Sequence, residues 1–224
     1  MTARRLSAAL CLLLLASCAG LPPVTPGGDA LSSRADEAFA PGAVFPEGRW
    51  QLLHAIHSEL PGGRTFVMLG LTVVSSPGRS CRSVLMTLEG FVVFDGEHDG
   101  RLTVHRALPP FDSPHFADGL MEDIRLVFFA PEGPVVARGV LAGGGPVRRH
   151  RLPDGGTVDV ELLPGADWRI LRYDASETLT RTVRARHGPG DQHGFPERLE
   201  LTASGGQDYR LTMTLIEAVP ATGS

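Results

Sequence analysis

The sequence contains no lysine, so all 21 of its basic residues are arginine, against 25 acidic residues and a net charge of −4. A signal peptide that ends before Cys18 would remove Arg4 and Arg5 and no acid, which leaves an even more acidic body. A nucleic-acid footprint needs a concentrated basic face, and the one basic cluster, residues 148–151, is expected to be an exposed strand end. The composition therefore argues against a nucleic-acid partner.

The chain also lacks a long hydrophobic run. Its apolar stretch, from about Leu6 to Ala16, is far shorter than the ~20 residues that span a bilayer. It follows Arg4 and Arg5 and ends in Leu15-Ala16-Ser17-Cys18, which resembles the lipobox of bacterial lipoproteins. We therefore expect residues 1–17 to be a lipoprotein signal peptide and Cys18 to carry the lipid. The alternative is an ordinary signal peptide cut near Ala19-Gly20.

Position 19 is Ala, not the Asp that retains many lipoproteins in the inner membrane, so this resemblance implies a periplasm-facing, lipid-anchored protein of the outer membrane. Cysteine is scarce, with Cys11, Cys18 and Cys81 only. If Cys18 is lipidated, no internal disulfide is possible and the fold depends on its core. Cys81 is expected to be a buried small residue or a neutral loop residue, with a reactive thiol as the alternative.

The sequence has no Gly-x-Ser-x-Gly elbow, P-loop or dinucleotide fingerprint. His54 and His57 would lie on opposite faces of a strand and could not share a metal. The loop with His187, Asp191 and His193 could hold zinc, but a solvated loop is the expectation. We expect Asp118, Glu122 and Asp123 to form the polar face of a helix. The prediction is a protein that is not an enzyme and has no cofactor and no metal.

Proline and glycine divide the chain into regions. Residues 18–47 read as a flexible tether, with room for one short helix between Asp29 and Phe39, residues 48–218 as one domain, and residues 219–224 as a disordered tail. In the domain, Val67, Leu69, Leu71 and Val73 alternate as one face of a strand. Residues 112–130 have apolar positions at helical spacing, with Asp112 or Ser113 as the cap and Pro131 beyond the end.

Turn residues separate the other apolar segments, and residues 135–141 could be a helix or a strand. Strands that follow one another through short turns are antiparallel. The sequence thus predicts a mainly β fold of about ten antiparallel strands in one curved sheet, with helical structure on its concave side.

The order and spacing of these segments resemble the LolA/LolB family of lipoprotein carriers and receptors, and its LolB branch in particular. The resemblance rests on Cys18, on residues 123–133, on Trp168-Arg169-Ile170-Leu171-Arg172-Tyr173, and on residues 195–201 with 209–215. It implies an unclosed antiparallel β-barrel with a helical lid and an apolar cavity for acyl chains. It also implies a loop with an exposed leucine that contacts the membrane, for which Leu88 is the positional match.

An acyl-chain site needs a concave apolar surface with few polar groups. The residues that we expect to line it are Trp50, Leu69, Leu71, Val73, Leu85, Phe91, Val93, Ile124 and Phe128. The first hypothesis is a monomeric membrane-anchored lipoprotein that binds the acyl chains of lipids or lipidated proteins and assists their transfer to the outer membrane. The second is a non-catalytic scaffold lipoprotein with a filled core that acts through protein contacts. The third and weakest is a periplasmic enzyme on lipid-like substrates.

Overall fold

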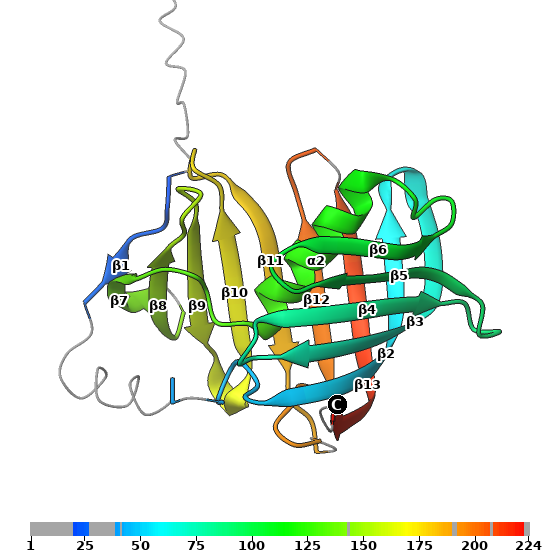
Figure 1. Cartoon of the computed structure of the whole chain (residues 1–224). Helices are drawn as coiled ribbons and strands as arrows, with labels where there is room; N and C mark the ends of the chain where they lie inside the picture. Colours follow the sequence, from blue (N-terminus) through cyan, green and yellow to red (C-terminus); the bar gives the residue numbers. More distant parts are fainter. Residues whose placement is uncertain are drawn as a thin grey trace, which may run out of the picture.

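The computed structural model describes residues 20–26, 39–40, 42–142, 144–189, 192–206 and 208–221. Cys18, the possible helix from Asp29 and the loop residue Asp191 lie outside the described residues. The described chain forms a 13-stranded sheet that is antiparallel throughout and does not close into a barrel. This confirms the expected mainly β fold and the unclosed antiparallel barrel implied by the resemblance, with more strands than the ten or so that were predicted. Figure 1 shows the sheet curving around a single long helix, α2.

The sheet has the order β1-β7-β8-β9-β10-β11-β12-β13-β2-β3-β4-β5-β6. One part of the sheet consists of β1 and the strands that follow α2 in the chain. These are β1 (Val24–Thr25), β7 (Val135–Leu141), β8 (Pro146–Arg151), β9 (Thr157–Leu162), β10 (Trp168–Tyr173), β11 (Leu179–Arg186), β12 (Arg198–Ala203) and β13 (Tyr209–Pro220). The other part comprises β2 (Arg49–Leu60), β3 (Arg64–Ser75), β4 (Ser80–Met86), β5 (Val92–His98) and β6 (Leu102–Ala107). The 3₁₀ turns η1 (Pro61–Gly63) and η2 (Pro164–Ala166) connect β2 to β3 and β9 to β10.

Helix α2 (Pro114–Phe128) begins where the sequence predicted, with Ser113 accepting a hydrogen bond from the Phe116 amide at 3.1 Å. Such a cap satisfies one of the free N–H groups of the first turn. Phe116 lies edge-on to Phe94 of β5, and Phe128 lies near His54 of β2. The helix therefore fills the concave side of the sheet, and its apolar residues belong to the main core cluster.

The faces of β3 differ from the expectation. Val67, Leu69, Leu71 and Val73 do share one face, but the buried set is the other one, from Met68 through Thr72 to Val74. The inward face has small residues where the core is tight: a Cβ on Gly70 would lie 2.5 Å from the Ile56 Cδ1 atom. The more apolar set of side chains thus lies on the outside of the sheet.

Residues 18–47, expected as a tether, include two segments that pack against the body. Val24 and Thr25 form β1 and pair with Leu141 and Val140 of β7. Phe39, Val44 and Phe45 are half-buried and pack against the main core. At the other end, β13 continues to Pro220, into the range expected as a tail.

Candidate functional site

A hollow of about 360 Å³ opens where the C-terminal end of α2 meets β8 and β9. The residues that line it come from the segment before β2, the turn before β4, the end of α2 and strands β8 and β9: Phe39, Ala40, Gly42, Val44, Phe45, Pro46, Glu47, Ser76, Arg79, Phe128, Phe129, Ala130, Pro131, Arg148, His150 and Val160. Its volume lies at the lower end of the range for small-molecule sites. We call this hollow the helix-end pocket.

The roof of the helix-end pocket consists of residues 39–40 and 42–47, for which we predicted no site role. The aromatic side chains Phe39, Phe45 and Phe128 and the aliphatic Val44 and Val160 make most of the pocket apolar. The sequence does contain a signal for the roof, namely Phe39, Val44 and Phe45 in a proline- and glycine-rich stretch. Large apolar residues are uncommon in a solvated tether.

Two arginines lie at the rim of this pocket. The Arg148 guanidinium lies 4.5 Å from the centre of the Phe39 ring, and its Nη1 atom donates to the Phe39 carbonyl oxygen at 3.4 Å. Arg79 lies 5.5 Å from the centre of the Phe129 ring and pairs with Glu132 at 3.1 Å. Both positive charges therefore lie against aromatic rings that line the pocket.

Glu132 joins the rim to the helix, because its Oε1 atom also accepts from Arg125 at 2.6 Å. Burial opposes ionisation here, but the hydrogen bond and charge of Arg125, together with Arg79, bring the pKa of Glu132 below its usual value. The Nε atom of Arg125 is buried without a hydrogen-bond partner. A second hollow of about 260 Å³ lies beside these residues, and its lining includes Glu122, Asp154 and Arg172.

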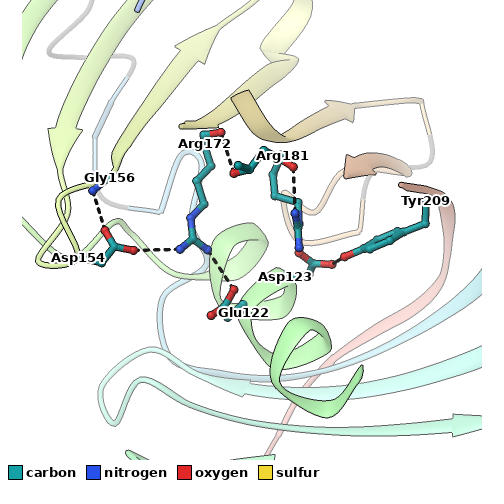
Figure 2. A network of polar contacts seen from close by, with 8 residues as sticks. Glu122, Asp123, Asp154, Gly156, Arg172, Arg181 and Tyr209 are labelled. Carbon is teal, nitrogen blue, oxygen red and sulfur yellow. Dashed lines mark hydrogen bonds and ion pairs between the residues drawn. The ribbon is translucent and has the colours of Figure 1, made fainter. Parts of the chain in front are cut away.

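A buried polar cluster fixes the middle of α2 to the sheet (Figure 2). Asp123 accepts from Arg181 Nε of β11 at 2.9 Å and from the Tyr209 hydroxyl of β13. The preceding residue, Glu122, pairs with Arg172 of β10 at 3.4 Å. Asp123 is only 5% exposed, so the expectation that it belongs to the solvated face of the helix is wrong.

The electrostatics of this cluster follow from its burial. Desolvation raises the pKa of Asp123 even though the Arg181 charge and the Tyr209 hydrogen bond act in the opposite direction. Desolvation and the Asp123 charge also raise the pKa of Tyr209. Breaking a buried pair leaves an uncompensated charge, which is costly, so the cluster acts as a clamp between lid and sheet.

The structure brings together only some of the residues expected to line a cavity. Phe128 lines the helix-end pocket. The ring centres of Trp50 and Phe195 lie 5.1 Å apart on the concave side. Leu85 and Ile124 are buried in the core, and Val93 packs against it. Leu69, Leu71 and Val73 lie on the outer face of β3, opposite to α2.

The turn between β4 and β5 is exposed and apolar. Leu88 is 61% exposed and Phe91, which was expected in the cavity, is 71% exposed. Thr87 closes the turn, since its backbone N–H donates to the Phe91 carbonyl at 2.9 Å and its carbonyl accepts from Gly90 at 3.0 Å. The turn therefore presents two large apolar side chains to its surroundings.

Burial governs the other candidate side chains. His54 is 4% exposed, and burial lowers its pKa to about 4. Burial raises the pKa of the Cys81 thiol to about 11, in keeping with the expectation of a buried small residue. His187 Nε2 lies 3.3 Å from the Gly194 carbonyl oxygen. Within the part of the chain that the structure describes, no three His, Cys, Asp or Glu side chains gather as a metal site would need.

The basic cluster at 148–151 is not the exposed strand end that we expected. Arg149 is 9% exposed, and its guanidinium makes two hydrogen bonds of 2.7 Å to Asp159, whose side chain is fully buried. The described residues contain no helix of the length and hydropathy that crossing a membrane requires.

Comparisons with known proteins agree with this architecture. No protein-family model matches the chain, and no curated protein matches it in sequence. Among solved structures it is similar to a LolA superfamily protein from Nitrosomonas europaea, with a TM-score of 0.57, 13% identity, and coverage of 87% of this chain and 94% of the other.

Two further structures are similar at lower TM-scores. A domain named as an outer membrane lipoprotein-sorting protein, from Vibrio parahaemolyticus, has a TM-score of 0.48 and 9% identity over 87% of this chain and 92% of that one. A DUF1329 family protein from Desulfovibrio piger has a TM-score of 0.49 and 13% identity, with the same coverage of 87% and 92%. The similarity to the Nitrosomonas europaea protein shows that the chain has the fold of that LolA superfamily protein, here an antiparallel half-barrel with a helical lid.

Proposed function

We propose that this chain is a lipoprotein, anchored by a lipid on Cys18 to the periplasmic side of the outer membrane, that binds acyl chains of lipids or lipidated proteins. It passes these chains to the membrane without catalysis and works as a monomer. The observation that carries the proposal is the helix-end pocket, a mostly apolar hollow of about 360 Å³ between the end of the lid helix and a roof formed by residues 39–40 and 42–47.

An acyl chain suits this pocket because binding needs no directional contacts. Each methylene that leaves water contributes ~0.8 kcal/mol. Phe39, Phe45 and Phe128 offer apolar surface, whereas the two rim arginines are held on ring faces and toward Glu132. A pocket of this size takes part of a chain, which favours release to a membrane over permanent storage.

The test is binding of a fluorescent fatty acid to the mature chain with Cys18→Ser. Val44 lies in the roof and lines the pocket, whereas its neighbour Ala43 is exposed and does not. We expect V44R to weaken binding at least tenfold, which corresponds to the loss of about two methylenes of contact, and A43R to bind like the parent. Absence of binding by the parent chain, or equal binding by both variants, would overturn the pocket assignment.

The β4–β5 turn is the proposed membrane contact. Leu88 and Phe91 are large, apolar and exposed, as a side chain that enters a lipid surface must be. The Cys18→Ser chain should float with phospholipid vesicles, and L88S together with F91S should abolish this. Ile216, 47% exposed on β13, supplies the control I216S. Flotation that survives the double change would exclude this turn.

A second candidate function is a scaffold that acts through protein contacts. It is favoured by the packing of the concave side, where α2 and sheet residues such as Phe94 and Ile170 form one continuous core. The outer face of β3 also presents partly exposed apolar residues, including Leu69 and Leu71. A scaffold would retain its protein partner after V44R, whereas a carrier would lose its lipid.

A further inference from the structure

The segment directly after the proposed lipidation site lies against the body. Residues 20–25, which we call the strap, run over the outer face of the sheet and end as β1 at its edge. Leu21 and Val24 pack on a small apolar cluster formed by Leu141, Val147, Leu171 and Tyr173. This cluster is separate from the main core, which lies on the concave side.

Polar contacts hold the strap to the strands beneath it. The Pro22 carbonyl oxygen accepts a hydrogen bond of 2.8 Å from Arg149 Nη2, the same nitrogen that donates to Asp159. The Leu21 amide donates to Glu177 Oε2 at 3.4 Å, in the turn between β10 and β11. The strap thus completes the hydrogen bonding of a buried arginine, and leaving the sheet would break these contacts.

The sequence also makes room for the strap. A Cβ on Gly139 of β7 would lie 2.1 Å from the Thr25 carbonyl oxygen and 2.9 Å from Val24 Cγ1. These distances are far below van der Waals contact, so any larger residue at position 139 is incompatible with β1 where it lies. Gly139 is therefore a specific requirement of strap docking.

Docking of the strap changes the reach of the anchor. Cys18 is two residues before Gly20, a distance of at most about 7 Å in extended chain. A free tether from Cys18 to residue 47 would have a root-mean-square length of about 30 Å. The strap shortens the free linker to a few ångströms and fixes the point on the body from which it leaves.

We propose that the strap is a short leash that orients the body at the membrane. It holds the end of the sheet with the β10–β11 turn, residues 174–178, next to the lipid surface. In Figure 1 that turn is at the top, next to residues 20–22 at the start of the strap, whereas residues 42–47, part of the pocket roof, are at the bottom. While the strap is docked, the roof therefore lies farther than this turn from the bilayer that holds the anchor. This inference rests on lipidation of Cys18, which belongs to the proposed function.

The experiment places a dye at either end of the full lipidated chain in vesicles of phosphatidylethanolamine and phosphatidylglycerol. Ala175→Cys labels the β10–β11 turn and Ala43→Cys labels the roof; both positions are exposed, and the buried Cys81 does not compete. We expect energy transfer to acceptor-labelled lipid to be at least twofold higher from position 175 than from position 43. The strap variants V24D and G139V should remove this difference.

The matched control for V24D is V136D, on the exposed face of β7 (Val136 is 54% exposed), which should keep the difference. Of the adjacent Val140 and Leu141 amides, only one can face β1, because successive N–H groups of a strand point to opposite sides. Faster hydrogen exchange at that amide reports strap release and separates it from unfolding of the rest. A chain whose Cys18 carries no acyl group in mass spectrometry overturns lipidation of Cys18 and the leash with it. A chain that carries the lipid but shows equal transfer from both dyes, or keeps the difference in V24D and G139V, overturns the leash alone.

Discussion

The buried imidazole of His54 makes the stability of the domain depend on pH. Burial lowers its pKa from 6.5 to about 4, so between these values the unfolded chain binds a proton that the folded chain does not. Stability is therefore fully present above pH 6.5 and is lost as the pH falls toward 4. The shift corresponds to about 3 kcal/mol in total, with a slope of about 1.2 kcal/mol per pH unit near pH 5.

The assay is urea unfolding of the chain from Ala19 onward at closely spaced pH values from 4 to 7.5. Carboxylates also titrate in this range, so the informative quantity is the difference in slope between the parent and H54L. Leucine suits the site, because His54 lies beside the Phe128 ring and pairs with Gly70 across the sheet. H57L, on the exposed face of the same strand, is the control and should keep the parental slope. Equal slopes in the parent and H54L would refute the reasoning.

Three further predictions follow from burial and close contacts. D123A should lower the free energy of unfolding by about 3–5 kcal/mol, because it removes the buried carboxylate that pairs with the half-buried Arg181 and accepts from the Tyr209 hydroxyl. D118A, at an exposed site of the same helix, should lower it by less than about 0.5 kcal/mol, and similar losses for both variants in urea titrations would show that the clamp adds nothing. G133A should destabilise the domain by more than about 1 kcal/mol, since the φ of Gly133 is 142° and an added Cβ would lie 2.0 Å from the Arg151 carbonyl oxygen. G119A should stabilise the domain by up to about 1 kcal/mol, because Gly119 lies in α2 with open space around it. Thermal melts that rank the two variants in the reverse order would contradict this. Cys81, the sole cysteine of the chain from Ala19, should resist a thiol reagent at pH 8 until denaturant is added, because its pKa is about 11; rapid labelling of the native chain would disprove its burial.

The spacing of apolar residues and the residue types of the turns predicted most of the fold. The helical spacing and the cap at Ser113 located α2, and the glycine- and proline-containing turns located the strands after it. These signals are local, so they are readable from neighbouring residues alone. Residues 135–141 were ambiguous because a short apolar run has no distinctive period, and the pairing of Val135 with His150 resolves them as a strand.

The orientation of β3 could not be predicted in the same way. Its outward face, with Leu69 and Leu71, is more apolar than its inward face, which includes Gly70 and Thr72. Position 70 is a glycine because Ile56 and Leu85 occupy the space where a side chain would lie. That constraint depends on distant parts of the chain. The hydrophobic pattern of the strand therefore predicted which residues share a face, but not which face points toward the core.

The charged residues show the same limit. We predicted solvent exposure for Asp123 and Arg149 because the sequence shows that a side chain is charged but not which residue it pairs with. Their partners, Arg181 and Asp159, lie 58 and 10 positions away and meet them only in the folded sheet. The helix-end pocket was missed for a related reason, since its roof comes from a segment whose prolines and glycines suggested a free tether.

The position of β13 in the sheet has a consequence for how the protein forms. Although β13 is the last strand of the chain, it pairs with β12 on one side and with β2 on the other, joining residues 50–59 to residues 210–220. Contacts between such distant segments are slow to form because the loop entropy is lost before they stabilise anything. Until its final strand is in place, the sheet consists of two unjoined halves with open edges. A chain that crosses a membrane from its N-terminus would therefore remain vulnerable to aggregation and proteolysis until its last dozen or so residues arrive.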